Sequence, residues 1–299
     1  MIYLDNAATT MRKPPQVVQA VVKALESIGN AGRGAYHASL DASRIIYDTR
    51  VKLVEFFGGD HAEQVAFTAN STESLNLAIK GLFYPGDHII TTALEHNSVL
   101  RPLYEMEEKG TELTILKSDE KGCISYEEME NAIRENTRAI ICTHGSNVTG
   151  NLLDLTKIGK IAKMHGLLFI VDASQTAGVF PINVKQMQID VLCFTGHKGL
   201  LGNSGVGGFC LAQSIEVEPL ISGGTGMDSF NHFQSDYYPE HVEAGTRNIT
   251  GIASLKAGVC YLMKYQDEKS KYTNELVELL YDGLKNIPQV VLYGDFKER

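Results

Sequence analysis

The chain has 299 residues, of which 43% are hydrophobic and 21% are charged. This apolar fraction is sufficient for a buried core and excludes a disordered or collagen-like protein. With 27 basic and 36 acidic side chains the formal net charge is −9, so we expect no binding to nucleic acid or to anionic membranes.

Targeting signals and metal motifs are not predicted. The longest uninterrupted apolar stretch, 167–171, is far shorter than the roughly 18 residues of a membrane span. Residues 1–6 show no basic region followed by an apolar one, so no secretory signal is expected. The five cysteines are widely spaced and form no C-x-x-C pair, which fits neither a disulfide framework nor a metal site. We therefore expect a soluble, cytoplasmic protein.

Segments of helical periodicity alternate with short β-branched runs up to about residue 210, which is the pattern of an α/β protein. The predicted helices are 15–27, 40–57, 72–83, 98–109, 126–134 and 155–165. The predicted strands are 64–67, 88–91, 113–116, 139–143, 167–171 and 191–194. The last two are continuously apolar, which is typical of strands buried on both faces of a mostly parallel sheet.

Beyond residue 200 the pattern changes. A glycine-rich segment, 202–208, precedes 209–211, which we expect to be an edge strand. Two long helices, 252–265 and 268–286, and one short strand, 290–293, follow. Because a lone strand leaves an unpaired edge, we expect further chain or a partner to complete it, so that the chain is a fragment.

These features divide the chain into two predicted domains. The large domain, which would bind the ligand, spans 15–250. Residues 1–14 and 251–299 would form part of a smaller domain whose remainder is missing.

Two side chains of opposite charge follow the last two buried strands. Lys198 follows 191–194, and Asp172 follows 167–171. In open α/β sheets ligands bind at the carboxyl ends of the strands, so we expect the two side chains to converge there. A partly desolvated lysine forms imines with aldehydes, and a carboxylate keeps a pyridine nitrogen protonated. Together they predict a pyridoxal phosphate (PLP) site, although alone each would suit a loop lysine or a helix cap.

Polar residues follow other strands at the same edge. Ser71 and Thr72 lie where strand 64–67 gives way to a helix, whose free backbone N–H groups can bind a phosphate. His96 follows strand 88–91, and Asn147 follows strand 139–143. Each has an ordinary alternative as a helix cap, a hydrogen-bonded loop histidine or a turn residue.

Taken in order, these residues resemble the class V aminotransferase family of fold-type I PLP enzymes, specifically cysteine desulfurases and selenocysteine lyases. The resemblance extends from 3–10 (YLDNAATT) to 243–248 (EAGTRN). It implies a three-layer α/β/α fold with a mostly parallel mixed sheet, an incomplete small α+β domain, and PLP as cofactor. It also implies removal of sulfur or selenium from cysteine or selenocysteine to leave alanine.

The resemblance implies roles for residues around the cofactor ring. Lys198 would bond the aldehyde, and Asp172 would pair with the ring nitrogen. Gln175 would hydrogen-bond the ring hydroxyl, and Asn147 would approach the cofactor and substrate. His96 would stack on the ring and carry protons.

A second set of implied roles concerns the cofactor phosphate. Thr195 and His197 would contact it beside Ser71 and Thr72. Thr246 resembles a threonine that reaches the phosphate of the neighbouring subunit. A homodimer is therefore implied, with an amino-acid substrate and a protein that accepts the sulfur.

The sequence also departs from the family pattern. Residues 30–34 keep an Arg-Gly that resembles an active-site loop, but Gly32 stands where many relatives carry histidine. The resemblance places the persulfide-forming cysteine and the substrate-carboxylate arginine beyond residue 299, so that this chain alone would be inactive as a desulfurase.

We assign none of the chain's own cysteines as the nucleophile. Cys142, Cys193 and Cys210 fall in predicted strands and Cys260 in an apolar helix, where thiols are buried and inert. Cys123 falls in a predicted turn far along the chain from the motifs.

Three alternatives to a desulfurase stay open at this point. The first is a class V aminotransferase or a related PLP lyase, and the second is a non-catalytic PLP-binding fragment. The third is an α/β protein for another phosphate ligand such as a nucleotide, although 202–208 does not form the G-x-G-x-x-G fingerprint.

Overall fold

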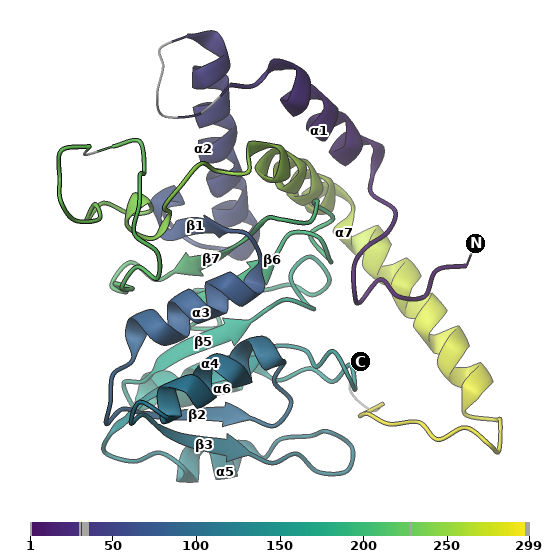
Figure 1. Cartoon of the computed structure of the whole chain (residues 1–299). Helices are drawn as coiled ribbons and strands as arrows, with labels where there is room; N and C mark the ends of the chain where they lie inside the picture. Colours follow the sequence, from purple (N-terminus) through teal and green to yellow (C-terminus); the bar gives the residue numbers. More distant parts are fainter. Residues whose placement is uncertain (1, 30, 32–35, 228, 297–299) are drawn as a thin grey trace.

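The computed structural model describes residues 2–29, 31, 36–227 and 229–296 (Figure 1). One mixed sheet has the strand order β1-β7-β6-β5-β4-β2-β3. Strands β2 to β6 run parallel to their neighbours among themselves, and β7 runs antiparallel to β1 and β6. The strands are β1 Val65–Thr68, β2 His88–Thr92, β3 Glu112–Leu116, β4 Thr137–Thr143, β5 Leu168–Asp172, β6 Val191–Thr195 and β7 Gly207–Leu211. The predicted α/β fold with a mostly parallel sheet is confirmed.

Helices cover both faces of this sheet. Side chains of α3 and α4 pack in one core, and those of α2, α5, α6 and α7 pack in the other. The helices are α1 Pro15–Ser27, α2 His37–Phe57, α3 Ser71–Leu82, α4 Asn97–Glu107, α5 Tyr126–Asn131, α6 Leu155–Met164 and α7 Ile249–Leu284. Short 3-10 turns lie at Ala62–Gln64 and Glu240–Val242.

Strand β5 contributes to both cores. Phe169 and Val171 belong to the core under α2 and α6, whereas Ile170 belongs to the core under α3. Successive side chains of a strand point to opposite faces, so a strand covered on both sides is apolar at every position. This burial holds the strand rigidly and presents Asp172 at its carboxyl end.

The two predicted C-terminal helices are a single helix, α7, of 36 residues. The prediction of a break near residue 266 was wrong because Gln266 and Asp267 are not helix breakers, and no proline occurs between Pro239 and Pro288. Gly258 lets the first half of α7 approach the turn that follows β6, since a Cβ there would lie 2.2 Å from the Leu200 carbonyl oxygen. Figure 1 shows that the end of α7 projects from the main body and that the residues after it (yellow) run back toward the body, where the Asp295 backbone N–H donates to Asn151 at 2.8 Å.

The strand predicted at 290–293 does not form. A strand depends on hydrogen bonds to a neighbouring strand, and within the described residues none lies beside this segment. The side chains of Val291 and Tyr293 are exposed. The proposed division into a large and a small domain stays a prediction.

The strand at 207–211 forms, but it is not at an edge. β7 lies between β1 and β6, and the edges of the sheet are β1 and β3. Its prediction as an edge strand was wrong because adjacency in sequence to β6 says nothing about β1, which precedes β7 by well over 100 residues and pairs with its other side.

A buried charge cluster joins the segment before α7 to the rest of the domain. Glu243 accepts hydrogen bonds from Arg50 on α2 and from Arg247, each at 2.7 Å. Its other oxygen accepts from the backbone N–H of Phe67 on β1. Because both guanidinium groups and a backbone amide satisfy this carboxylate, the pairing offsets the cost of burying its charge.

Among the described residues, no helix combines the length and the apolar character that a membrane crossing requires.

Candidate functional site

Lys198 and Asp172 lie on the wall of one pocket at the carboxyl ends of the parallel strands. Asp172 is the last residue of β5, and in the sheet it is level with Thr143 of β4 and Cys193 of β6. Lys198 follows β6 by three residues. The predicted convergence of the two charges at this edge therefore agrees with the geometry, and the pocket has a volume of about 370 Å³.

Nearly all of the site residues predicted from the sequence line this pocket. Its wall includes the predicted residues Ser71, Thr72, His96, Asn147, Asp172, Gln175, Thr195, His197 and Lys198. They come from the ends of five strands and the starts of two helices, so the shared strand direction explains why residues so distant in sequence meet.

Burial and charge act in opposite directions on Lys198. Burial lowers the pKa of its ammonium, and the nearby Asp172 carboxylate partly restores it. A lysine with a lowered pKa has more of the neutral amine that attacks an aldehyde. Lys198 is therefore suited to act as a nucleophile.

Asp172 is held by hydroxyl and amide donors rather than by a cation. It is 3% exposed and accepts hydrogen bonds from the Ser174 backbone N–H at 2.9 Å and from the Ser174 hydroxyl at 2.5 Å. The Ser71 hydroxyl is 3.4 Å from the same oxygen. These donors stabilise a charged carboxylate at a fixed place in the wall.

The start of α3 provides an anion site in the same pocket. Asn70 caps the helix by accepting from the Glu73 backbone N–H at 3.0 Å, and Thr72 lies one residue into the first turn, 2.8 Å from the Ser98 hydroxyl. The hydroxyl of Thr195 is buried and has no hydrogen-bond partner among the described residues. Free helix amides and an unsatisfied hydroxyl fit a phosphate group.

An amine, a carboxylate and an anion site in one pocket are what PLP requires: a lysine for the aldehyde, an acid for the ring nitrogen and a phosphate cradle. The residues present therefore fit the predicted cofactor.

His96 and Gln175 are oriented by their neighbours. The backbone N–H of Ser98 donates to Nδ1 of His96 at 3.1 Å, so the neutral ring carries its proton on Nε2. Gln175 donates to the carbonyl of Ala7 at 3.1 Å. Asn147 is exposed at the rim.

Thr246 is not brought together with the other predicted residues. It lines a separate cavity of about 210 Å³ with Glu73, Gly205 and Arg247. Its contact with a neighbouring subunit stays a prediction. The proposed active-site loop lies outside the described residues, apart from Ala31.

Several pocket residues were not predicted from the sequence. Asp5, Ala7 and Ala8 line the wall, and Thr9 bridges to the ring of His197, whose Nδ1 is 2.9 Å from the Thr9 hydroxyl. The signal that could have found them is the run of small and polar residues at 5–10, which lies ahead of the prolines at the start of α1.

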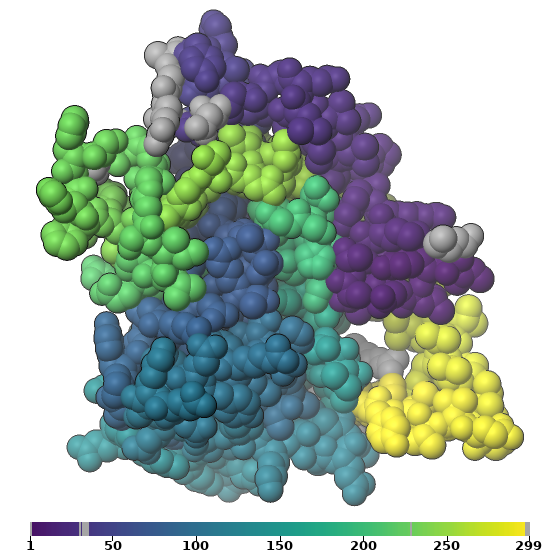
Figure 2. All heavy atoms as spheres, viewed as in Figure 1, coloured from purple at the N-terminus to yellow at the C-terminus, as the bar shows by residue number. Residues whose placement is uncertain are grey.

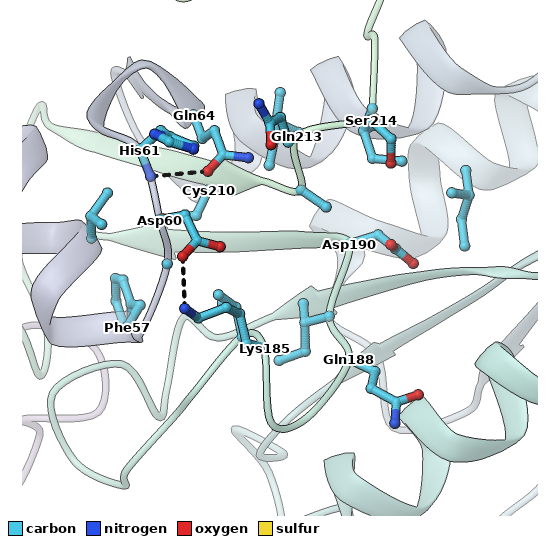
Figure 3. Close-up of a pocket in the computed structure, with 18 of the residues that line it drawn as sticks. Phe57, Asp60, His61, Gln64, Lys185, Gln188, Asp190, Cys210, Gln213 and Ser214 are labelled. Carbon is cyan, nitrogen blue, oxygen red and sulfur yellow. Dashed lines mark hydrogen bonds and ion pairs between the residues drawn. The ribbon is translucent and has the colours of Figure 1, made fainter.

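A second, larger pocket of about 480 Å³ lies at the opposite edge, where β5 and β6 begin (Figure 3). Lys185 in this pocket is ion-paired with Asp60 at 2.7 Å. Asp190 accepts from the Phe169 backbone N–H, and burial raises the pKa of its carboxyl. None of the predicted site residues lines this pocket.

The cysteines lie away from the pocket of Lys198, and none of the five lines it. Burial raises the pKa of Cys142 and Cys193 well above the usual range and that of Cys210 to about 12, so these thiols are inert as predicted. Cys123 lies 3.7 Å from Asp295. The prediction for Cys260 was wrong, because it lies on the exposed side of α7.

Glu95 is a buried carboxyl group just behind the pocket. It accepts from the Thr92 hydroxyl at 2.6 Å, whereas its other oxygen has no partner among the described residues. Burial raises its pKa to about 8, with a smaller contribution from Asp172. A carboxyl group with this pKa is mostly protonated at pH 7.

We expect the fold to lose stability as the pH rises from about 4.5 to about 8, because over this range Glu95 is ionised in the unfolded chain but protonated in the folded one. In the Glu95→Gln variant, the free energy of unfolding should no longer fall by the amount that Glu95 causes over this pH range, which is on the order of 2–4 kcal/mol. Urea unfolding at pH 5 and pH 8 measures this difference. The exposed variant Glu107→Gln is the control, and an equal loss in Glu95→Gln and wild type would contradict the assignment.

The fold agrees with comparisons to known proteins. The family model "Aminotransferase class-V" matches residues 2–299. A "Probable cysteine desulfurase" of Methanothermobacter thermautotrophicus is 34% identical over 301 residues, which cover 98% of this chain and 75% of the relative. "Cysteine desulfurase IscS" of Methanosarcina thermophila is 33% identical and covers 100% of this chain and 71% of its own length. The apo cysteine desulfurase structure from Thermococcus onnurineus superposes with a TM-score of 0.93 at 33% identity, over 99% of this chain and 76% of that one.

Proposed function

Because this chain belongs to the class V aminotransferase family, whose members use PLP, we propose that it is a cysteine desulfurase-like enzyme. The reaction removes sulfur from cysteine, or selenium from selenocysteine, and leaves alanine. The observation that carries the proposal is the meeting of Lys198 and Asp172 in one pocket with an anion site. The names of the relatives support the choice of substrate.

In this proposal PLP supplies an electron sink for the negative charge that develops at the substrate α-carbon. Lys198 would hold the cofactor aldehyde, and the start of α3 with Thr72, Thr195 and His197 would hold the phosphate. Asp172 would pair with the ring nitrogen.

The chain's own groups then orient and move protons. Asp172 would keep a proton on the ring nitrogen, and the hydroxyl and amide of Ser174 keep Asp172 in place. Lys198, as a free amine with a lowered pKa, takes and returns the proton of the substrate α-carbon. Nε2–H of His96 is the second proton donor at the pocket wall.

Sulfur transfer requires a thiolate that attacks the substrate sulfur. In this step the carbon–sulfur bond breaks, the sulfur joins the attacking thiol as a persulfide, and the carbon is protonated to give alanine. No cysteine of this chain lines the pocket. The thiol is therefore proposed to come from an acceptor outside residues 1–299, and the working unit is proposed to be a homodimer in which Thr246 reaches the partner's phosphate.

We expect the chain, loaded with PLP and given cysteine and dithiothreitol as the thiol acceptor, to form alanine and sulfide in equal amounts. Alanine is measured by amino-acid analysis and sulfide by methylene blue. The matched control omits dithiothreitol. Alanine formation that instead depends on an added keto acid would contradict the proposal and identify a class V aminotransferase.

A second candidate function is favoured by the position of the cysteines. If the chain binds PLP but forms alanine under neither condition, it is a PLP-binding protein without desulfurase turnover.

A further inference from the structure

Residues 9–13 lie against the turn that carries Lys198. In Figure 2 the N-terminal residues (purple) cover this flank of the segment that follows β6 (green-teal). The contacts join residues that are 184 to 188 positions apart in the sequence. The N-terminal segment is therefore part of the site although it precedes α1.

The contacts are concentrated on the two peptide groups next to Lys198. The carbonyl of His197 accepts from the Lys13 ammonium at 2.8 Å and from the Thr10 backbone N–H at 3.2 Å. The carbonyl of Lys198 accepts from the Thr10 hydroxyl at 2.8 Å. The backbone is thus fastened on both sides of the Lys198 Cα.

Burying the charged side chain of Lys13 costs free energy. It is partly buried, burial lowers its pKa, and it has no carboxylate within ion-pair distance in the described part of the chain. A charged donor on a carbonyl is stronger than a neutral one, and here it is directed at one oxygen. Lys13 does not line the pocket, so it can act on a ligand through the backbone of His197 and Lys198 or through the effect of its charge on the His197 ring, whose pKa it helps to lower.

We infer that Lys13, with Thr10, is a positioning residue that fixes the backbone of Lys198 so that its amine faces Asp172 across the pocket. A lysine side chain has four rotatable bonds, so a movable Cα would spread the amine over many positions. A small misplacement of a reacting group lowers its reactivity substantially. The inference rests on the proposed function, since it concerns how Lys198 meets PLP.

The test compares Lys13→Met, Lys13→Arg and the control Lys23→Met, which removes an exposed lysine from α1. Each protein, freed of cofactor, is titrated with PLP and separately with pyridoxal, which lacks the phosphate. The readouts are the visible absorbance of the lysine-bound aldehyde and its trapping by borohydride. Lys13→Met should raise the apparent dissociation constant for both compounds about tenfold, and Lys13→Arg should raise it by less than about threefold. Lys23→Met should bind like wild type.

Equal binding by Lys13→Met and wild type would overturn the inference. So would a loss for PLP alone, because the charge would then act on the phosphate rather than through the backbone. If Lys13→Met does not fold, Thr10→Val decides: binding of both compounds weakened by about threefold supports the inference, and unchanged binding overturns it. A wild-type chain that captures neither compound would instead contradict the proposed function.

Discussion

Replacing Lys198 with alanine is expected to abolish covalent capture of PLP and to lower turnover of cysteine by at least about a thousandfold. Lys198 is the lysine in the pocket wall, and burial has already lowered its pKa. Without it the cofactor has no amine to bond and the substrate α-carbon has no base. Borohydride reduction followed by mass spectrometry of the peptides measures the covalent bond, and alanine formation measures the turnover.

Lys185→Ala is the matched control, because Lys185 is also in a pocket but is ion-paired with Asp60 at the other edge of the sheet (Figure 3). It should leave labelling and turnover unchanged. A borohydride label that persists on another lysine in Lys198→Ala would contradict the role given to Lys198. Added methylamine is expected to restore part of the proton transfer in Lys198→Ala, which a merely unfolded variant would not show.

The position of this lysine and of Asp172 could be predicted because it follows from a simple periodicity. Two fully apolar runs predict buried parallel strands, and the residues that come next must lie at the carboxyl edge. The same reasoning places Ser71, Thr72, His96 and Asn147 there. The common location of side chains at strand ends can thus be predicted from a single sequence, because strand direction alone brings them together.

The supporting contacts could not be predicted in this way. Lys13 and Thr10 donate to backbone carbonyl groups. Because every residue has a backbone carbonyl, no residue type in the sequence indicates which one accepts. Likewise the hydroxyl pair of Ser71 and Ser174 spans 103 positions and needs the fold to form. Strand ends are therefore predictable from the sequence, whereas the contacts that hold the side chains at those ends are not.

The errors after residue 200 have a similar origin. The position of β7 within the sheet depends on pairing with β1, and the course of α7 depends on the absence of a breaker over its full length. The exposure of Cys260 depends on which side of α7 faces the sheet, and an apolar sequence around a helix does not decide that. Local periodicity gives the type of an element more readily than its neighbours.

Replacing Asp172 with asparagine is expected to preserve covalent capture of PLP but to lower turnover on the order of a thousandfold. Asparagine has nearly the same size and keeps an oxygen that can accept from the Ser174 backbone N–H, now at 2.9 Å from Asp172. It carries no charge, so in the proposed site the proton on the ring nitrogen would no longer be stabilised. Exchange of the alanine α-hydrogen in D₂O, followed by NMR, isolates this step from sulfur transfer.

The same substitution should also lower the pKa of Lys198. The Asp172 carboxylate raises the pKa of Lys198 against the larger effect of burial, so removing the charge lowers that pKa further and leaves more neutral amine at a given pH. In the cofactor-free chain, the pH profile of Lys198 modification by an amine reagent should therefore move to lower pH. Asp190→Asn, a half-buried aspartate at the start of β6, is the control and should change neither readout. Exchange at the wild-type rate in Asp172→Asn would mean that another group holds the ring nitrogen. Slow exchange with an unchanged pH profile of Lys198 modification would mean that the Asp172 charge does not act on Lys198. Only a change in both readouts fits one acid and one amine acting on a single ligand from its two sides.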